Sequence, residues 1–172
     1  MDFDFTEDQE QLRDAVRKWV DKAYTFERRR TIAKDGGFSA DAYQELADLG
    51  LCGLYVPEDL GGLGMGPVEG MVVMEELGRG IVLEPLAQAL IAGAVLGHYA
   101  PKPLATEWAG AVASGESLVS LAYQERAARY RLDNCTTQAS GKDGAWTLSG
   151  AKSLVVAGDR ADAYLVSAMR DG

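Results

Sequence analysis

The sequence has little histidine and little cysteine, and both shortages exclude familiar kinds of site. His98 is the only histidine among 172 residues, which excludes a histidine-based catalytic triad and a metal site built from several histidines. We therefore predict no metal site. Cys52 and Cys135 are the only cysteines. Because residues 1–10 are acidic and do not resemble a secretory signal, we expect two free thiols in a cytoplasmic protein.

Basic residues are also scarce. The chain has 17 lysines and arginines against 26 aspartates and glutamates, which gives a net charge of −9. Nucleic acid and anionic membranes both attract basic patches, so we predict neither as a partner. The longest apolar region, residues 81–99, is interrupted by charged and polar residues and predicts a buried helix, not a membrane span. With 47% apolar and 25% charged residues, the chain can bury a core.

The first part of the chain, residues 1–113, follows a helical pattern. Thr6 and Gln9 predict a capping box, after which apolar residues recur at helical spacing to an expected end near Asp35. Further helices are expected over residues 42–49 (capped by Ser39), 67–77, 85–96 and 104–113. Short connections between them predict a bundle of antiparallel neighbours. The residues expected to be buried in this bundle are Trp19, Leu46, Leu54, Met74 and Leu90.

Beyond residues 114–116 the pattern becomes one of short strands. The expected strands cover residues 118–123, 135–140, 146–149, 151–156 and 163–168. A turn cluster at residues 141–144 predicts a hairpin between the second and third of them. Helices followed by antiparallel strands are typical of the α+β class. We therefore predict an N-terminal helical bundle over residues 1–113 and a partial antiparallel β domain over residues 114–172.

Neither a P-loop nor a Rossmann glycine motif is present, but a different glycine-rich segment stands out at residues 50–65. Its composition alone is that of an ordinary loop between helices. Its order, GLCGLYVPEDLGGLGM, resembles the G-L-x-G-L-x-V-P-E-x-x-G-G-x-G segment of the acyl-CoA dehydrogenases. Further resemblances follow in the family's order at residues 5–9, 74–80, 113–116, 143–152 and 161–162. The resemblance therefore covers the whole chain and extends the α+β prediction to an acyl-CoA dehydrogenase-like fold.

The resemblance implies a flavoprotein of fatty acid metabolism, an oxidoreductase that binds FAD and converts an acyl-CoA thioester to its α,β-enoyl form. In this family a glutamate of a C-terminal helical bundle removes the α-proton. These 172 residues do not include that bundle, so we assign no catalytic residue and expect the chain by itself to be inactive. The chain is most similar to the variant subgroup that includes the small subunit of pimeloyl-CoA dehydrogenase.

The resemblance also places the family's flavin contacts on the predicted β segment. The matching positions are Tyr123, Gln124, Arg129, Tyr130, Leu154, Val155 and Val156. Five of them depart from the family's pattern, and among these Gln124 replaces a threonine, Leu154 a tryptophan and Val156 a hydroxyl residue. Arg129 and Tyr130 replace a glycine-serine pair beside the flavin pyrophosphate, which the charge of Arg129 can attract. The same departures are compatible with loss of the flavin.

The helix expected over residues 85–96 carries four residues at the spacing of the family's acyl-chain pocket: Gln88, Ala89, Ala92 and Leu96. Ordinary core packing explains this spacing equally well. Two functions stay open: an FAD-dependent acyl-CoA dehydrogenase-like protein that binds acyl-CoA, or a non-catalytic supporting subunit or fragment of a hetero-oligomer, with or without flavin. Uncovered strand edges predict a homo- or hetero-oligomer with acyl-CoA dehydrogenase-like chains.

Overall fold

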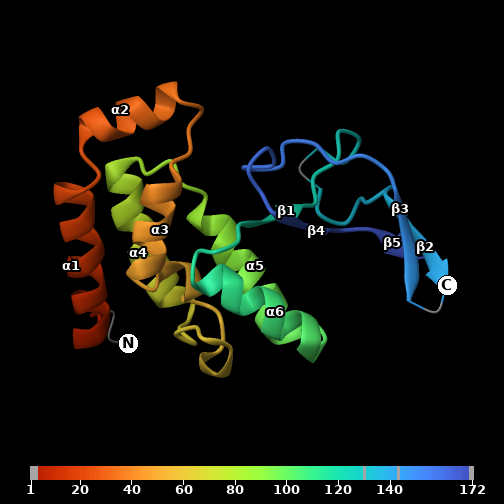
Figure 1. Ribbon diagram of the computed structural model, residues 1–172, viewed down its shortest axis with the longest axis horizontal. Helices are drawn as coiled ribbons and strands as arrows, with labels where there is room; N and C mark the ends of the chain where they lie inside the picture. Colours follow the sequence, from red (N-terminus) through yellow and green to blue (C-terminus); the bar gives the residue numbers. More distant parts are fainter. Residues whose placement is uncertain (1–3, 130, 143, 171–172) are drawn as a thin grey trace. The chain divides into compact units, whose positions relative to one another are not determined.

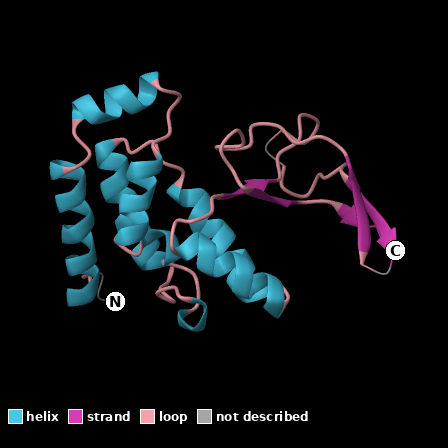
Figure 2. Cartoon of the chain, in the orientation of Figure 1, coloured by secondary structure: helices cyan, strands magenta, loops and turns pink. Residues whose placement is uncertain are grey.

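The computed structural model describes residues 4–129, 131–142 and 144–170 and divides the chain into two compact units (Figure 1). The first unit extends to Ser117 and is helical, whereas the second begins at Leu118 and is built from short strands (Figure 2). The predicted α+β class, with helices first and strands after, is confirmed. No helix in the described part of the chain is long and apolar enough to cross a membrane.

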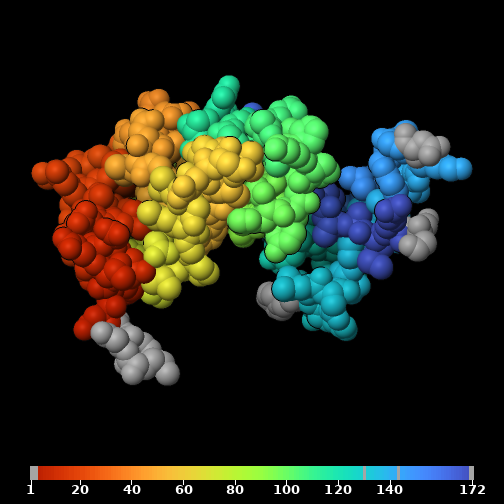
Figure 3. Space-filling model, turned by 90° about the horizontal axis from the view of Figure 1, so that it is seen from below, coloured from red at the N-terminus to blue at the C-terminus, as the bar shows by residue number. Residues whose placement is uncertain are grey.

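The helical unit follows the predicted order of helices. They are α1 (Glu7–Lys22), α2 (Phe26–Lys34), α3 (Ala40–Asp48), α4 (Pro67–Gly80), α5 (Leu86–Tyr99) and α6 (Lys102–Ala113). The capping box of Thr6 and Gln9 is present, and the Ser39 side chain accepts a hydrogen bond from the backbone of Ala42 (3.2 Å). Within this unit α1 packs along α4 and α5 along α6 (Figures 1 and 3).

One helix expected from the sequence is two in the structure. The backbone of Thr25 is extended, with φ −65° and ψ 160°, and its side-chain oxygen accepts a hydrogen bond from the backbone of Arg28. Thr25 therefore caps a new helix and separates α1 from α2. The Arg28 guanidinium also donates to the carbonyl of Ala23 (3.1 Å), which satisfies a backbone group left open at the break.

The core of the helical unit confirms most of the predicted burial. Leu46, Leu54 and Leu90 are buried. Trp19 is half-buried, and its indole nitrogen donates to the carboxylate of Glu45 (2.8 Å). Burying a side chain as large as leucine contributes roughly 1.5–3 kcal/mol, so these positions are a main source of the unit's stability.

The predicted burial of Met74 is wrong, because its side chain is 39% exposed. Helix α4 buries a different face, which includes Val72, Val73 and Leu77. The helix is apolar around most of its circumference, so the sequence does not specify which face enters the core. Packing against α1 selects the face.

The glycine-rich segment at residues 50–65 folds back on itself in two 3-10 turns, Leu51–Gly53 and Glu58–Leu60. Backbone hydrogen bonds join its ends, from Leu63 to Gly53 (2.9 Å) and from Met65 to Leu54 (2.8 Å). A Cβ on Gly62 would lie 2.0 Å from the carbonyl oxygen of Val56. Only glycine allows this close approach of two backbone segments.

The β unit contains two small sheets. Its strands are β1 (Val119–Ala122), β2 (Gln138–Lys142), β3 (Ala145–Ser149), β4 (Ala163–Val166) and β5 (Met169–Arg170). β2 and β3 form the predicted antiparallel hairpin, with Gln138 opposite Ser149. The sequence predicts antiparallel strands throughout, and this is wrong for two pairs. β1 pairs with β4 in parallel, and β2 pairs with β5 in parallel. Parallel pairs need long connections, and each of these pairs spans other strands of the unit.

The strand expected over residues 151–156 does not form. Leu154 has a φ of 53° and Ala157 a φ of 52°, which are left-handed values incompatible with a ladder. Ser153 instead donates its backbone N–H to the carbonyl of Gln124 (2.8 Å). β2 likewise begins later than expected, because the backbone N–H groups of Thr136 and Thr137 bind a carboxylate.

Candidate functional site

The β unit contains a pocket of about 740 Å³. It is formed by the loop that follows β1 and the loop that follows β3, which the hydrogen bond between Ser153 and Gln124 joins. Its lining residues are Gln124, Glu125, Arg126, Arg129, Lys152, Ser153 and Leu154. A volume of this size is within the usual range for small-molecule and cofactor sites.

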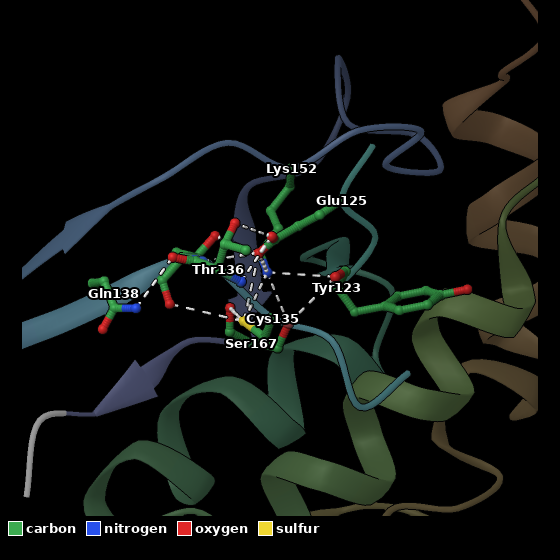
Figure 4. A network of polar contacts seen from close by, with 8 residues as sticks. Tyr123, Glu125, Cys135, Thr136, Gln138, Lys152 and Ser167 are labelled. Atoms are coloured by element: carbon green, nitrogen blue, oxygen red, sulfur yellow. Dashed lines mark hydrogen bonds and ion pairs between the residues drawn. The ribbon is translucent and has the colours of Figure 1, made fainter. Parts of the chain in front are cut away.

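The pocket brings together three residues of the predicted flavin site: Gln124, Arg129 and Leu154. Tyr123, Val155 and Val156 lie on the same two loops but outside the described lining. The ring of Tyr123 points away from the polar network beside the pocket (Figure 4). The predicted contact at Tyr130 falls outside the residues that the structure describes.

Two of the pocket residues adopt a backbone conformation that is rare outside glycine. Arg129 has a φ of 52° and Leu154 a φ of 53°. Each such residue costs energy that the surrounding structure must offset, and such residues gather at binding and active sites. The side chain of Leu154 is 81% exposed. Its conformation is therefore compatible with a ligand-facing role in the pocket.

Glu125 is the hub of the polar network at the pocket and is 4% exposed. One carboxylate oxygen accepts hydrogen bonds from the backbone N–H (3.0 Å) and hydroxyl (2.7 Å) of Thr137. The other accepts from the backbone N–H (2.8 Å) and the hydroxyl of Thr136. The ammonium group of Lys152 lies 2.8 Å from the first oxygen. Both oxygens are therefore fully engaged.

These contacts fix the charge of Glu125. The hydrogen bond from Lys152, followed by those from Thr136 and Thr137, holds the pKa of the Glu125 carboxyl far below its usual range. Glu125 therefore stays a carboxylate and has no free oxygen for a substrate proton. Its role is to hold the two pocket loops.

Lys152 extends the network to two more segments. Its ammonium group donates to the hydroxyl of Ser167 (3.0 Å), the carbonyl of Tyr123 (3.4 Å) and the sulfur of Cys135 (3.5 Å), as Figure 4 shows. Its side chain is buried along with that of Glu125. A buried charge pair of this kind is strongly sensitive to loss of either partner, because the other charge is then left uncompensated.

Sequence reasoning did not assign four of the lining residues to the site: Glu125, Arg126, Lys152 and Ser153. The signal was present for two of them, since the family resemblance retains an acidic residue at Glu125 and a basic residue at Lys152. Glu125 and Lys152 are 27 residues apart in the chain, and nothing in the sequence indicated that their opposite charges would be in contact. Arg126 carried no signal that separated it from other exposed arginines.

The predicted substrate residues lie on α5 in the helical unit. Ala89, Ala92 and Leu96 are buried, and Gln88 is half-buried. They share one face of the helix, as their spacing requires. Both interpretations of that face, core packing and contact with an acyl chain, stay predictions.

Adjacent residues on a helix face different directions, and of the pair Glu75 and Glu76 on α4 only Glu76 is buried. Its buried carboxylate binds Arg17 of α1 (2.6 Å) and Arg79 (2.8 Å). The hydrogen bond from Arg17 is the main reason that the pKa of the Glu76 carboxyl is lowered. Glu76 therefore joins α1 to α4, whereas Glu75 is exposed.

Replacing Glu125 by glutamine should destabilise the chain at neutral pH and make its stability less sensitive to acid. The native pKa of Glu125 lies below its unfolded value, so its contribution is complete above about pH 4.5 and is lost progressively as pH falls below that value. Urea unfolding between about pH 3 and pH 7 measures this. The difference between Glu125→Gln and the native chain should shrink towards low pH.

Asp159→Asn is the matched control, because Asp159 is an exposed carboxylate of the same unit. Its unfolding free energy should stay within about 0.5 kcal/mol of the native value over the whole range. A Glu125→Gln chain that lost as much stability at about pH 3 as at pH 7 would show that the ionised carboxylate is not what stabilises the loops.

Comparison with known proteins matches residues 6–116 to the family described as acyl-CoA dehydrogenase, N-terminal domain. The acyl-CoA dehydrogenase FadE27 of Mycobacterium tuberculosis is 30% identical, with 99% of this chain and 45% of the relative covered. The mitochondrial short-chain specific acyl-CoA dehydrogenase of Bos taurus is 27% identical, with 96% and 40% covered. The chain therefore spans less than half the length of these relatives.

Among solved structures, the ChsE4–ChsE5 complex from Mycobacterium tuberculosis matches with a TM-score of 0.87 and 29% identity. The match covers 99% of this chain and 46% of that chain. A steroid ACAD, Tcur3481–Tcur3483, matches with a TM-score of 0.88 and 26% identity, covering 95% and 45%. Both matches include the helical unit and the β unit.

Proposed function

The chain belongs to the acyl-CoA dehydrogenase family. We propose that it is part of an FAD-dependent oxidoreductase that forms the α,β double bond of an enoyl-CoA. Residues 1–113 would supply the N-terminal helical domain and residues 114–172 the first part of the middle β domain. The observation that carries the proposal is the pocket in the β unit, where Gln124, Arg129 and Leu154 meet.

The residues of the pocket fit an anionic dinucleotide. Arg126 and Arg129 are exposed at its wall and offer charge-assisted hydrogen bonds to a pyrophosphate. The exposed side chain of Leu154 offers an apolar contact for a planar ring. Bound FAD would supply the acceptor for the β-hydrogen. Glu125 and Lys152 would keep the two loops in place and thereby orient the groups that bind it.

The substrate in this proposal is an acyl-CoA thioester. Gln88, Ala89, Ala92 and Leu96 are the residues of α5 that would contact its acyl chain. Two of the four are alanines, so replacing these alanines with larger apolar residues would reduce the length of acyl chain that fits. The described residues include no carboxylate that can act as the base at the pocket, since Glu125 is held ionised and fully hydrogen-bonded.

Arg129→Ala should weaken FAD binding by roughly ten- to a hundredfold, because a charge-assisted hydrogen bond contributes about 1.5–3 kcal/mol. A titration of FAD, followed by the change in flavin fluorescence, measures the affinity. The control is Arg160→Ala, which removes an arginine of the same unit that is not among the described pocket residues. Equal affinity in Arg129→Ala and Arg160→Ala would refute the assignment of Arg129.

A second candidate function is a flavin-free supporting subunit of a hetero-oligomeric acyl-CoA dehydrogenase. Two observations favour it: the departures from the family pattern at Gln124, Leu154 and Val156, and the match to the ChsE4–ChsE5 complex. The visible absorption spectrum separates the two candidates, because a protein with oxidised flavin is yellow. A colourless chain that binds no added FAD but associates with a homologous chain would support the second.

A further inference from the structure

The thiol of Cys135 lies beside the amine of Lys152, and the proposed flavin site makes no use of this contact. The two atoms, Sγ and Nζ, are 3.5 Å apart in the network of Figure 4. We propose that these side chains form a peroxide-sensitive modification site, in which an S–N bond links Cys135 to Lys152. The proposal does not depend on flavin binding.

The proposal requires that peroxide reacts with Cys135 and not with Cys52, and the two cysteines differ in their burial. Cys52 is completely buried, and burial raises the pKa of its thiol to about 11. A thiol in such surroundings is unreactive at neutral pH. Cys135 is half-buried, and its neighbour Lys152 lines the pocket, so a small oxidant can reach this part of the unit. Oxidation by peroxide should therefore select Cys135.

The surroundings of Cys135 hold its sulfur close to the amine. The Sγ atom lies 3.4 Å from the carbonyl oxygen of Ser167 and 3.5 Å from a carboxylate oxygen of Glu125. The Lys152 amine is fixed at the same place by Glu125 (2.8 Å) and the Ser167 hydroxyl (3.0 Å). Two groups held in contact react far faster than the same groups free in solution.

The chemistry needs hydrogen peroxide as the oxidant and proceeds in two steps. The Cys135 thiol gives its proton to solvent, and the resulting thiolate attacks peroxide: an S–O bond forms, the O–O bond breaks, sulfur loses two electrons, and hydroxide leaves. That hydroxide takes a proton from the Lys152 ammonium and becomes water. The neutral amine then attacks the sulfenic sulfur, so that the S–N bond forms, the S–O bond breaks, and a second water is released.

The link would change the charge of the pocket wall. Lys152 would lose its positive charge, and Glu125 would keep only its hydrogen bonds from Thr136 and Thr137. An anionic ligand of the pocket would lose one attractive charge on the protein. This last consequence rests on the proposed function, whereas the link itself does not.

The test is to treat the purified 172-residue chain with hydrogen peroxide, alkylate it, digest it and identify peptides by mass spectrometry. We expect a cross-linked pair containing Cys135 and Lys152, lighter by two hydrogen atoms than the sum of the two peptides and released by dithiothreitol. Cys52→Ser should form the same pair. Lys152→Arg should form none and should instead accumulate a sulfenic acid at Cys135, trapped by dimedone.

Two results would overturn the proposal. In the first, the native chain treated with peroxide carries a dimedone adduct or a higher oxide at Cys135, and no cross-linked pair is found. The other is oxidation of Cys52 in preference to Cys135. Both are read from the native chain, so they do not depend on whether a variant folds. Because no flavin is present in the experiment, its outcome is separate from that of the FAD titration.

Discussion

The 172-residue chain by itself is expected to show no acyl-CoA-dependent turnover, even with FAD added in excess. Dehydrogenation begins with removal of an α-proton, and a well-placed base contributes typically ~10²–10⁴-fold to such a step. Glu125 is the one carboxylate among the described residues that line the pocket. Lys152 and the two threonines hold its pKa far below the range in which it could accept a proton.

The measurement is the acyl-CoA-dependent bleaching of an artificial electron acceptor, with substrates of short, medium and long acyl chains. An intact acyl-CoA dehydrogenase serves as the positive control, and free FAD without protein gives the background. Turnover above that background by the isolated chain would refute the prediction. Turnover that also survived in Glu125→Gln would locate the base elsewhere in these residues.

Leu46→Ala is expected to lower the free energy of unfolding by about 2–5 kcal/mol. Leu46 lies on α3 and is among the largest side chains that are completely buried. Truncation removes its transfer free energy and leaves a cavity that its neighbours fill only in part. Urea denaturation at neutral pH, followed by circular dichroism at 222 nm, which reports helix unfolding, gives the value.

Met74→Ala is the control for this substitution, because it also shortens a large apolar side chain in a helix but at an exposed position. Its effect should stay within about 0.5 kcal/mol. A loss at Met74 as large as that at Leu46 would mean that the exposed face of α4 is covered in solution. A loss below about 1 kcal/mol at Leu46 would contradict the core described above.

Local features of the fold could be predicted from the sequence where a few neighbouring residues decide the structure. Thr6 and Ser39 each cap a helix through their own side chains. The hairpin of β2 and β3 follows from alternating strands around a turn cluster. The flavin contacts expected at Gln124, Arg129 and Leu154 came from the family resemblance and stay predictions, but the three residues do line one pocket.

Features that depend on distant contacts could not be predicted in this way. Packing on α1 decides which side of α4 is exposed. The burial of Glu76 depends on its pairing with Arg17, which is 59 residues away in the chain. The loop at residues 151–156 has the composition of a strand but is held by Gln124 and Glu125. In each case the deciding interaction is non-local and overrides the local propensity.

The network around Glu125 also has a consequence for the order of folding. It joins Tyr123, Glu125, Cys135, Lys152 and Ser167, with partners up to 44 residues apart. Such contacts form only after the entropy of closing long loops has been lost, and chains dominated by them fold slowly. Helices such as α5 and α6, which are consecutive in the chain and pack on each other, can form earlier. By the same argument the pocket takes shape after the pair of α5 and α6, and its two loops become ordered together when the buried charge pair forms.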